Sequence, residues 1–202
     1  MNYHPTKATL RRLLSLAQGQ GGYFTAKQAA EIGYLSPHLD YHVGAGNFLR
    51  VGHGVYRLPE VPIGEHDDLV RLAFWSRGRD DQPQAIASHS TALGIHGLSD
   101  LLPSKIHLTV PMTFRKEPPK GIVLHRNKLA ASDIEDREGF QVTAPLRTIL
   151  DIAADERNSE EHLGKAIAEA LARGLVRKSA LAGLAKKLPP ANRLSRSLAA
   201  VS

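Results

Sequence analysis

The side chains with the most evident chemistry in this chain gather between Gly22 and Leu58. They are hydrogen-bonding and cationic types, which suit the base edges and phosphate oxygens of DNA. Several of them share one predicted helix, which begins at Ser36 and Pro37 and runs to about Val43. The residues that we expect to contact DNA are Thr25, Lys27, Gln28, Ser36, His38, Tyr41, His42, Arg50, His53 and Arg57.

The elements that position these side chains follow from local signals. Thr25 and Gln28 form a T-x-x-Q capping box, which predicts a helix that begins there and ends at Gly33. Proline at position 37 suits the first turn of a second helix. The glycines of Gly52-His53-Gly54 then predict the turn of a hairpin between Leu49–Val51 and Val55–Leu58. Helix, turn, helix and hairpin is the order of a winged helix-turn-helix, and its second helix is the candidate reader of a major groove.

A further helix is expected before this unit, from Thr6 to Ala17, where leucines recur at helical spacing. We expect it to complete a three-helix core. Its cations lie off the apolar stripe, where they either contact phosphates or form a solvated face: Lys7, Arg11 and Arg12. The plainer alternative for the whole unit is a small helical module with a solvated polar face, but capping, periodicity and turn residues agree on the DNA-binding fold.

The histidines allow a metal hypothesis, which the sequence does not favour. His38 and His42 are spaced i, i+4 on one helix face, as in two-histidine metal sites. Neither a carboxylate nor a third histidine is evident beside them, so we expect groove or solvent exposure and no metal. His89 and His96 share a second helix face, and for both we expect core or cap roles.

Charge is concentrated at the two ends of the chain. Residues 1–60 carry six lysines and arginines against three acidic residues, and residues 162–202 carry eight against one, whereas the middle is mildly acidic. Basic segments favour nucleic acid through counterion release. For the basic tail, three interpretations remain open: a second contact to DNA, a contact to an acidic partner protein, or solubility alone.

A change of charge sign and two prolines at Leu58–Gly64 predict a domain boundary, which gives a winged helix-turn-helix in residues 1–60 and a second domain in residues 61–202. The fold class is therefore α+β: the second domain is a small β-sheet packed by helices. The expected helices are 65–76, 85–96, one from 145, 160–173 and 179–188, and the expected strands are 105–110, 121–125 and 140–143. We expect the last twelve residues to be frayed.

The sequence contains no known catalytic motif. The chain has no cysteine, which excludes disulfides and thiolate chemistry. Walker, dinucleotide and nucleophile-elbow motifs are absent, and no glutamate is followed two residues later by lysine, as a magnesium-dependent nuclease would need. We therefore expect a protein that is not an enzyme and needs no cofactor. Without a long apolar segment or a secretory signal, we expect a cytoplasmic protein with no membrane contact.

Several sequence blocks resemble the AbiEi-type antitoxins of bacterial type IV toxin–antitoxin, or abortive infection, systems. The resemblance begins with FTAKQAAEIG and NFLRVGHGVYRL, continues through AIASHSTALGIHGLSD and IHLTVP, and ends with FQVTAPLRTILDIA. It implies an antitoxin that represses its own operon and counters a nucleotidyltransferase-like toxin encoded beside it. The implied partners are operator DNA upstream of its own gene and that toxin.

Two other classes of function stay open. In one, the second domain binds the toxin directly and the helix-turn-helix is only a scaffold, without physiological DNA binding. In the other, the protein is an enzyme that modifies the toxin or its substrate. A stable complex with the toxin would favour the first of these, and neutralisation by catalytic amounts of the protein would favour the second.

Overall fold

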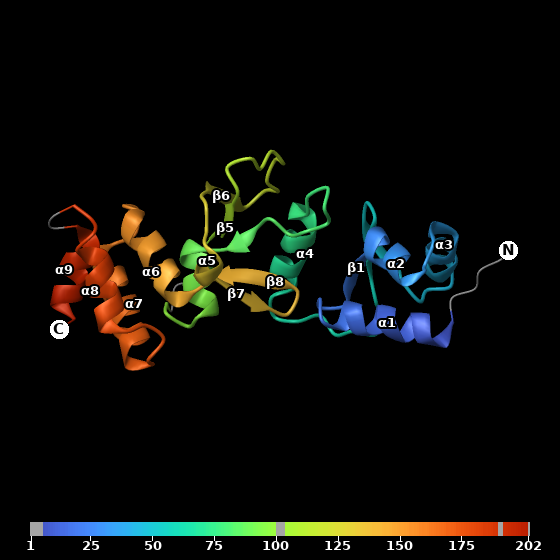
Figure 1. Ribbon diagram of the computed structural model, residues 1–202, viewed down its shortest axis with the longest axis horizontal. Helices are drawn as coiled ribbons and strands as arrows, with labels where there is room; N and C mark the ends of the chain where they lie inside the picture. Colours follow the sequence, from blue (N-terminus) through green and yellow to red (C-terminus); the bar gives the residue numbers. More distant parts are fainter. Residues whose placement is uncertain (1–5, 100–103, 190–191, 202) are drawn as a thin grey trace. The chain divides into compact units, whose positions relative to one another are not determined.

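The structure is a computed structural model, and it describes residues 6–99, 104–189 and 192–201 (Figure 1). The chain forms two compact units. The first comprises residues 1–83 together with 136–140, and the second comprises 84–135 and 141–202. The first unit therefore extends beyond the predicted boundary near residue 60. Each unit has its own hydrophobic core.

The first unit begins with the predicted winged helix-turn-helix. Three helices are joined by a three-stranded antiparallel sheet of order β1-β3-β2. The sequence predicted the hairpin but missed β1, which pairs Phe24 with Tyr56. The elements are α1 (Lys7–Gln18), β1 (Tyr23–Thr25), α2 (Ala26–Ile32), α3 (Ser36–Gly44), β2 (Leu49–Gly52) and β3 (Val55–Arg57).

Aromatic side chains hold this small core together. Phe24 is fully buried, stacks on Tyr56 with ring centroids 5.5 Å apart and meets the edge of Phe48 at 5.2 Å. Leu13 of α1 and Leu39 of α3 are also buried against the cluster. Burying such side chains contributes roughly 1.5–3 kcal/mol each, so this contact set fixes α3 relative to the wing sheet.

The first unit continues into α4 (Asp67–Ser76), which the sequence predicted to begin two residues earlier. The Tyr23 hydroxyl donates to the Asp67 carboxylate at 3.0 Å. The segment 136–140 also belongs to this unit, and Gly139 within it has φ of +82°. A Cβ atom on Gly139 would lie 3.0 Å from the backbone carbon of Gln20, so glycine is required there both by conformation and by space.

The second unit is built on a five-stranded mixed sheet of order β6-β5-β4-β8-β7. β5 and β6 run parallel, as do β4 and β8, whereas β4 and β5 are antiparallel. Three of these strands were predicted, and β4 and β7 were missed. The strands are β4 (Ile86–Ala87), β5 (Ile106–Val110), β6 (Ile122–Arg126), β7 (Ile134–Arg137) and β8 (Phe140–Thr143).

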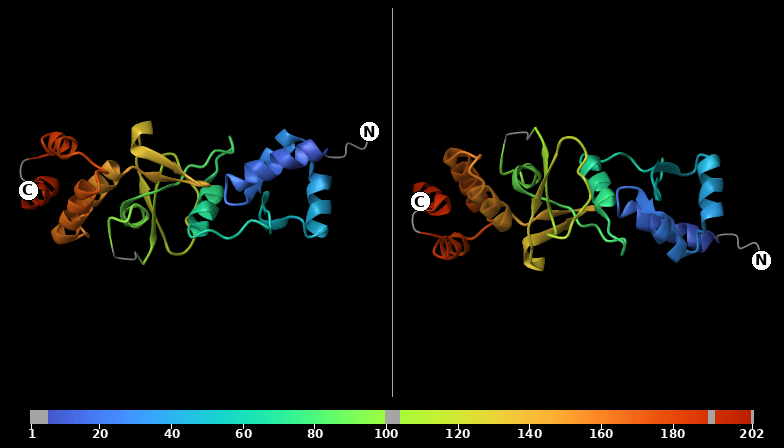
Figure 2. Two further views of the ribbon diagram at one scale, coloured as in Figure 1. Left: turned by 90° about the horizontal axis from the view of Figure 1, so that it is seen from below. Right: turned by 90° about the horizontal axis from the view of Figure 1, so that it is seen from above.

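The C-terminal helices of the second unit group together (Figure 2). Their core includes Ile149, Leu163, Ile167 and Leu181, all fully buried. A short 3₁₀ turn, η1 (Ala131–Asp133), precedes β7. The α-helices are α5 (His89–Ile95), α6 (Pro145–Ala154), α7 (Glu160–Ala172), α8 (Lys178–Ala185) and α9 (Arg193–Ala200).

Two predictions about these helices were wrong. The helix expected over 85–96 begins only at His89, because Ile86 and Ala87 pair with β5 and β8 instead. The tail expected to be frayed forms α9, in which Asn192 caps the first turn and Leu194 is fully buried. In the described part of the chain, no helix is long and apolar enough to cross a membrane.

Candidate nucleic-acid interface

Local sequence signals fix where α2 begins and ends and where α3 begins. The Thr25 side chain accepts from the Gln28 amide at 3.1 Å, and the Gln28 side chain accepts from the Thr25 amide at 2.9 Å, so the predicted capping box is present. Gly33 ends α2 with φ of +104°, a left-handed conformation that favours glycine. Pro37 lies in the first turn of α3, and Leu39, 1% exposed, anchors that helix to the core.

Opposite Leu39, α3 presents a polar face. Ser36 is exposed, and the Tyr41 side chain is 70% exposed without serving the core. The His38 ring has a local role, because its Nδ1 accepts from the Leu35 amide at 3.2 Å and caps the start of the helix. The predicted recognition helix therefore offers a hydroxyl, a phenol and an imidazole near its first two turns.

His42 is less available than the other predicted α3 residues. Its ring stacks on Phe48 with centroids 4.7 Å apart, and its Nδ1 lies 3.1 Å from the side-chain nitrogen of Asn47. Burial, followed by the nearby His38, lowers the pKa of His42. At neutral pH its imidazole is therefore neutral, and it forms the edge of the core more than the exposed face.

On the wing, His53 and Arg50 are both exposed. His53 lies in the turn beside Gly54, whose φ is +66°. The Arg50 guanidinium donates to Asp40 at 2.7 Å and to the Tyr56 hydroxyl at 3.1 Å, so it links the wing to α3. Asp40 was not predicted to be part of this site, although it lies on the same predicted helix as His38 and Tyr41.

Arg57 is a correction to the predicted interface. Only 6% of this residue is exposed, and its guanidinium donates to the Val61 carbonyl and lies 5.6 Å from the Tyr23 ring centroid. Arg57 and Tyr23 are directly opposite each other in the antiparallel β1–β3 pair, so their side chains share a face. This face is covered, and Arg57 stabilises the fold instead of facing DNA.

At the start of α2, the predicted contacts are also mostly internal. Thr25 is 6% exposed, and its hydroxyl donates to Asp81 at 2.6 Å. The Gln28 side chain is held by Thr25 and by Gln20. Lys27 alone of these three predicted contacts is exposed.

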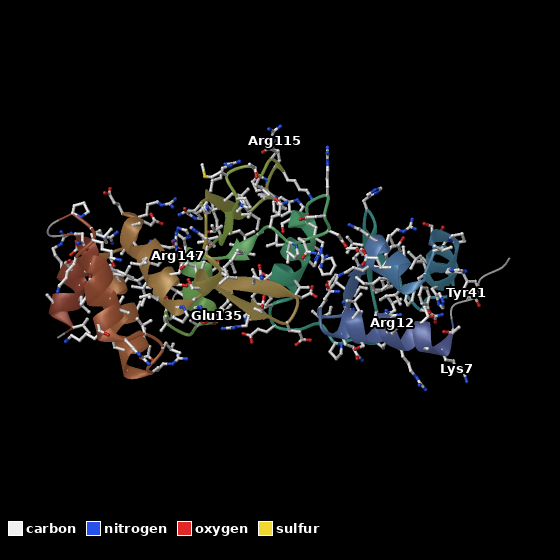
Figure 3. All side chains as sticks on the ribbon, in the orientation of Figure 1. Lys7, Arg12, Tyr41, Arg115, Glu135 and Arg147 are labelled. Atoms are coloured by element: carbon white, nitrogen blue, oxygen red, sulfur yellow. The ribbon has the colours of Figure 1, made fainter. Side chains whose placement is uncertain are left out.

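Cations on α1 add to the exposed positive charge of this unit. Lys7, Arg11 and Arg12 are all exposed, and Figure 3 shows Lys7 and Arg12 on α1 and Tyr41 on α3. Cations and phenolic or imidazole donors on one small unit can position a phosphate backbone and read base edges. Among the residues that the structure describes, no group of three histidine or acidic side chains could hold a metal ion.

Two family models match the chain. Residues 11–59 match a family model described as a transcriptional regulator, AbiEi antitoxin, and residues 85–197 match one described as the AbiEi antitoxin C-terminal domain. No curated protein matches the chain. Among solved structures, the RV2827C protein of Mycobacterium tuberculosis is 16% identical, with a TM-score of 0.45; the match covers 100% of this chain and 79% of that one.

Proposed function

The chain belongs to the AbiEi antitoxin family, and from this premise we propose that it represses its own operon by binding the DNA upstream of its gene and counteracts a nucleotidyltransferase-like toxin. The observation that carries the DNA-binding part is the exposed face of α3. Leu39 fixes the helix from behind, and Tyr41 points outward with 70% of its surface exposed. A rigid helix with an unburied polar face suits insertion into a major groove.

In this mechanism the residues divide into readers and positioners. Ser36, His38 and Tyr41 on α3 approach base edges, while His53 enters from the wing. Arg50 contacts a phosphate near the wing, which requires exchange of its bond to Asp40. The exposed cations of α1 and Lys27 supply further phosphate contacts. Arg57, Thr25 and Gln28 keep the frame in place.

The direct test is a fluorescence-anisotropy titration with the duplex upstream of the gene and a scrambled duplex of equal length, each at two salt concentrations. We expect tighter binding to the upstream duplex. Tyr41→Ala should reduce the preference for that sequence. Arg50→Ala should weaken binding to both duplexes and make the salt dependence shallower by about 0.9 in log–log slope, as for one lost phosphate contact.

The matched control is Arg79→Ala, which removes one exposed cation of the same unit outside the helix-turn-helix and the wing. It should leave sequence preference unchanged. Equal binding to the upstream and scrambled duplexes at both salt concentrations would contradict the repressor function.

The second candidate function is direct contact with the toxin, without physiological DNA binding. A groove of about 480 Å³ between α8 and α9 favours it. Its floor includes Ala182, Ala185 and Leu198, and Lys178 and Lys186 line it as well. Since residues 162–202 carry eight cations against one acidic residue, the fitting occupant is an acidic amphipathic segment of the toxin.

Co-purification of the two proteins tests this alternative. A stable complex that Lys178→Glu and Lys186→Glu together disrupt would support contact at this groove. A toxin that is neutralised in cells but never co-purifies would contradict stable binding.

A further inference from the structure

A cavity of about 870 Å³ lies in the second unit, and none of the residues predicted to contact DNA lines it. The end of β6, helix α6, the loop after α6 and the start of α9 line it. Its volume is within the range of small-molecule sites, about 300–1,000 Å³. Its charged and titratable lining consists of four arginines, two histidines and three carboxylates: Arg126, Arg147, Arg157, Arg193, His89, His125, Asp151, Asp155 and Glu156.

The two histidines form part of a connected stack. The rings of His89 and His125 are parallel within 14° and their centroids are 3.5 Å apart. Nδ1 of His107 lies 3.0 Å from Nε2 of His125, so one of these nitrogens donates and the other accepts. Burial, followed by the neighbouring imidazoles, lowers the pKa of His89 to about 3 and that of His125 to about 4. Because the three imidazoles are uncharged at neutral pH, their rings can lie close together without charge repulsion.

The backbone at His89 is strained, with φ of +53° at the junction of β4 and α5. This left-handed conformation is uncommon for residues other than glycine, although asparagine, aspartate and histidine adopt it more often than the rest. The position is also tied down by hydrogen bonds, because the Thr109 hydroxyl donates to Ser88 at 2.8 Å, and the Ser88 hydroxyl lies 3.0 Å from Nδ1 of His89. Strained residues that the surroundings hold in place concentrate at functional sites.

The carboxylates of the cavity hold two of the arginines in fixed orientations. Arg147 donates through Nε to Asp151 at 2.9 Å, and Arg157 donates to both oxygens of Asp155 at 2.8 and 3.0 Å. Each of these bonds uses one edge of a guanidinium that carries five N–H donors, and Nη1 of Arg147 also lies 3.7 Å from Asp133. The remaining donors are therefore pre-oriented, which lowers the entropic cost of binding a ligand.

The other two arginines differ from each other. Arg193 donates to the backbone carbonyls of Asp155 and Asn158 and so joins α9 to the loop after α6. Arg126 is exposed and makes no ion pair within residues 6–99, 104–189 and 192–201. Arg126 therefore lines the same cavity as the two neutral imidazoles and has no ion-pair partner in those residues.

This geometry points to a binding site for a small phosphate-bearing molecule of nucleotide size, whose phosphate contacts Arg126 and the His89–His125 pair. Planar guanidinium donors match phosphate oxygens in pairs, and imidazole N–H groups donate to the same oxygens. A metal-dependent site does not fit, because no metal-binding group of three is found among the described residues.

The test uses the full chain and the side-chain nitrogen resonances of its histidines, observed by NMR during separate titrations with inorganic phosphate, pyrophosphate, ATP and adenosine. We expect pyrophosphate and ATP to shift the signals of His89 and His125 in a saturable way, with phosphate binding more weakly and adenosine causing no shift. The signal of His53 on the wing is an internal control, because any phosphate contact of the DNA-binding unit would appear there.

Arg126→Gln should weaken pyrophosphate binding at least tenfold, since it removes a charge-assisted contact. Arg115→Gln is the matched control: Arg115 is an exposed arginine of the same unit that does not line the cavity, whereas Arg147 does (Figure 3). The proposal is overturned if none of the phosphate compounds shifts His89 and His125, if adenosine shifts them as ATP does, or if Arg126→Gln binds as the wild type does. DNA binding by α3 can succeed or fail independently of these results.

Discussion

His89 makes a quantitative prediction about acid stability. The residue is 9% exposed, and burial together with His125 and His107 lowers its pKa from 6.5 to about 3. In the unfolded chain the same imidazole titrates near 6.5. Between pH 6.5 and 5, therefore, the unfolded state binds a proton at this imidazole and the folded state does not. Stability from this group is present above pH 6.5 and is lost as pH falls. Over 1.5 pH units at about 1.4 kcal/mol each, the loss is about 2 kcal/mol.

The substitution that isolates this effect is His89→Asn. Asparagine tolerates the left-handed backbone, offers a side-chain acceptor to Ser88 and does not titrate. Urea unfolding followed by far-UV circular dichroism at pH 7 and pH 5 measures the change in free energy of unfolding. Fluorescence would not serve, since the single tryptophan, Trp75, lies in the first unit.

We expect the loss between pH 7 and pH 5 to be about 2 kcal/mol smaller in His89→Asn than in the wild type. His53→Asn, at the exposed turn of the wing, is the control and should lose as much as the wild type. If His89→Asn showed the same loss as the wild type, the buried, neutral histidine stack would be refuted.

Three further predictions concern other parts of the chain. Thr25→Val should lower the free energy of unfolding of the first unit by about 1–2 kcal/mol, because it removes an N-cap and the bond to Asp81; Trp75 fluorescence during urea unfolding measures this. Asp40→Asn should raise affinity for scrambled DNA several-fold in the anisotropy assay, because it frees Arg50 and removes a negative charge from α3. Burial raises the pKa of Asp151 from 3.8 to about 6, so the wild type is destabilised by about 2 kcal/mol as the pH rises from about 4 to 6. Asp151→Asn should remove this destabilisation, which the variant-minus-wild-type difference in unfolding free energy over this pH range measures.

The helix-turn-helix was predictable because its signals are local. The T-x-x-Q box at Thr25, the left-handed Gly33 and Pro37 in the first turn of α3 each act within three or four residues. Such signals can be recognised in a sequence without knowledge of distant contacts, and they gave the correct order of the helices and the hairpin in the first 58 residues.

The elements that were missed depend on distant partners. β1 and β4 have three and two residues, too few for a periodic pattern, and they exist because β3, β5 and β8 pair with them. α9 is held by Arg193, which donates to the carbonyl oxygens of Asp155 and Asn158, more than thirty residues earlier. Its composition alone is that of a polar tail.

For the candidate site, residue type was predictable but side-chain direction was not. Arg50 and Arg57 have the same chemistry and lie on neighbouring strands of one hairpin. Arg50 is opposite Tyr56, however, and Arg57 is opposite both Leu49 and Tyr23. Directly opposite residues share a face, so the two arginines point to opposite sides of the sheet. Only the pairing with β1, which the sequence did not reveal, shows that the Arg57 side is covered.

Polar side chains whose hydrogen bonds are used within the fold differ in role from those that are exposed or line the cavity. Arg57 and Thr25 are buried and their donors are used within the fold, so they stabilise it. Tyr41 is 70% exposed on α3, where its phenol is accessible to the DNA partner proposed above. His89 is buried, has a left-handed backbone and is uncharged, and it lines the same cavity as Arg126, which makes no ion pair among the residues that the structure describes. This arrangement costs stability at low pH. A residue that the fold holds at such a cost is best explained by a ligand, which is why the cavity, as much as α3, merits a binding experiment.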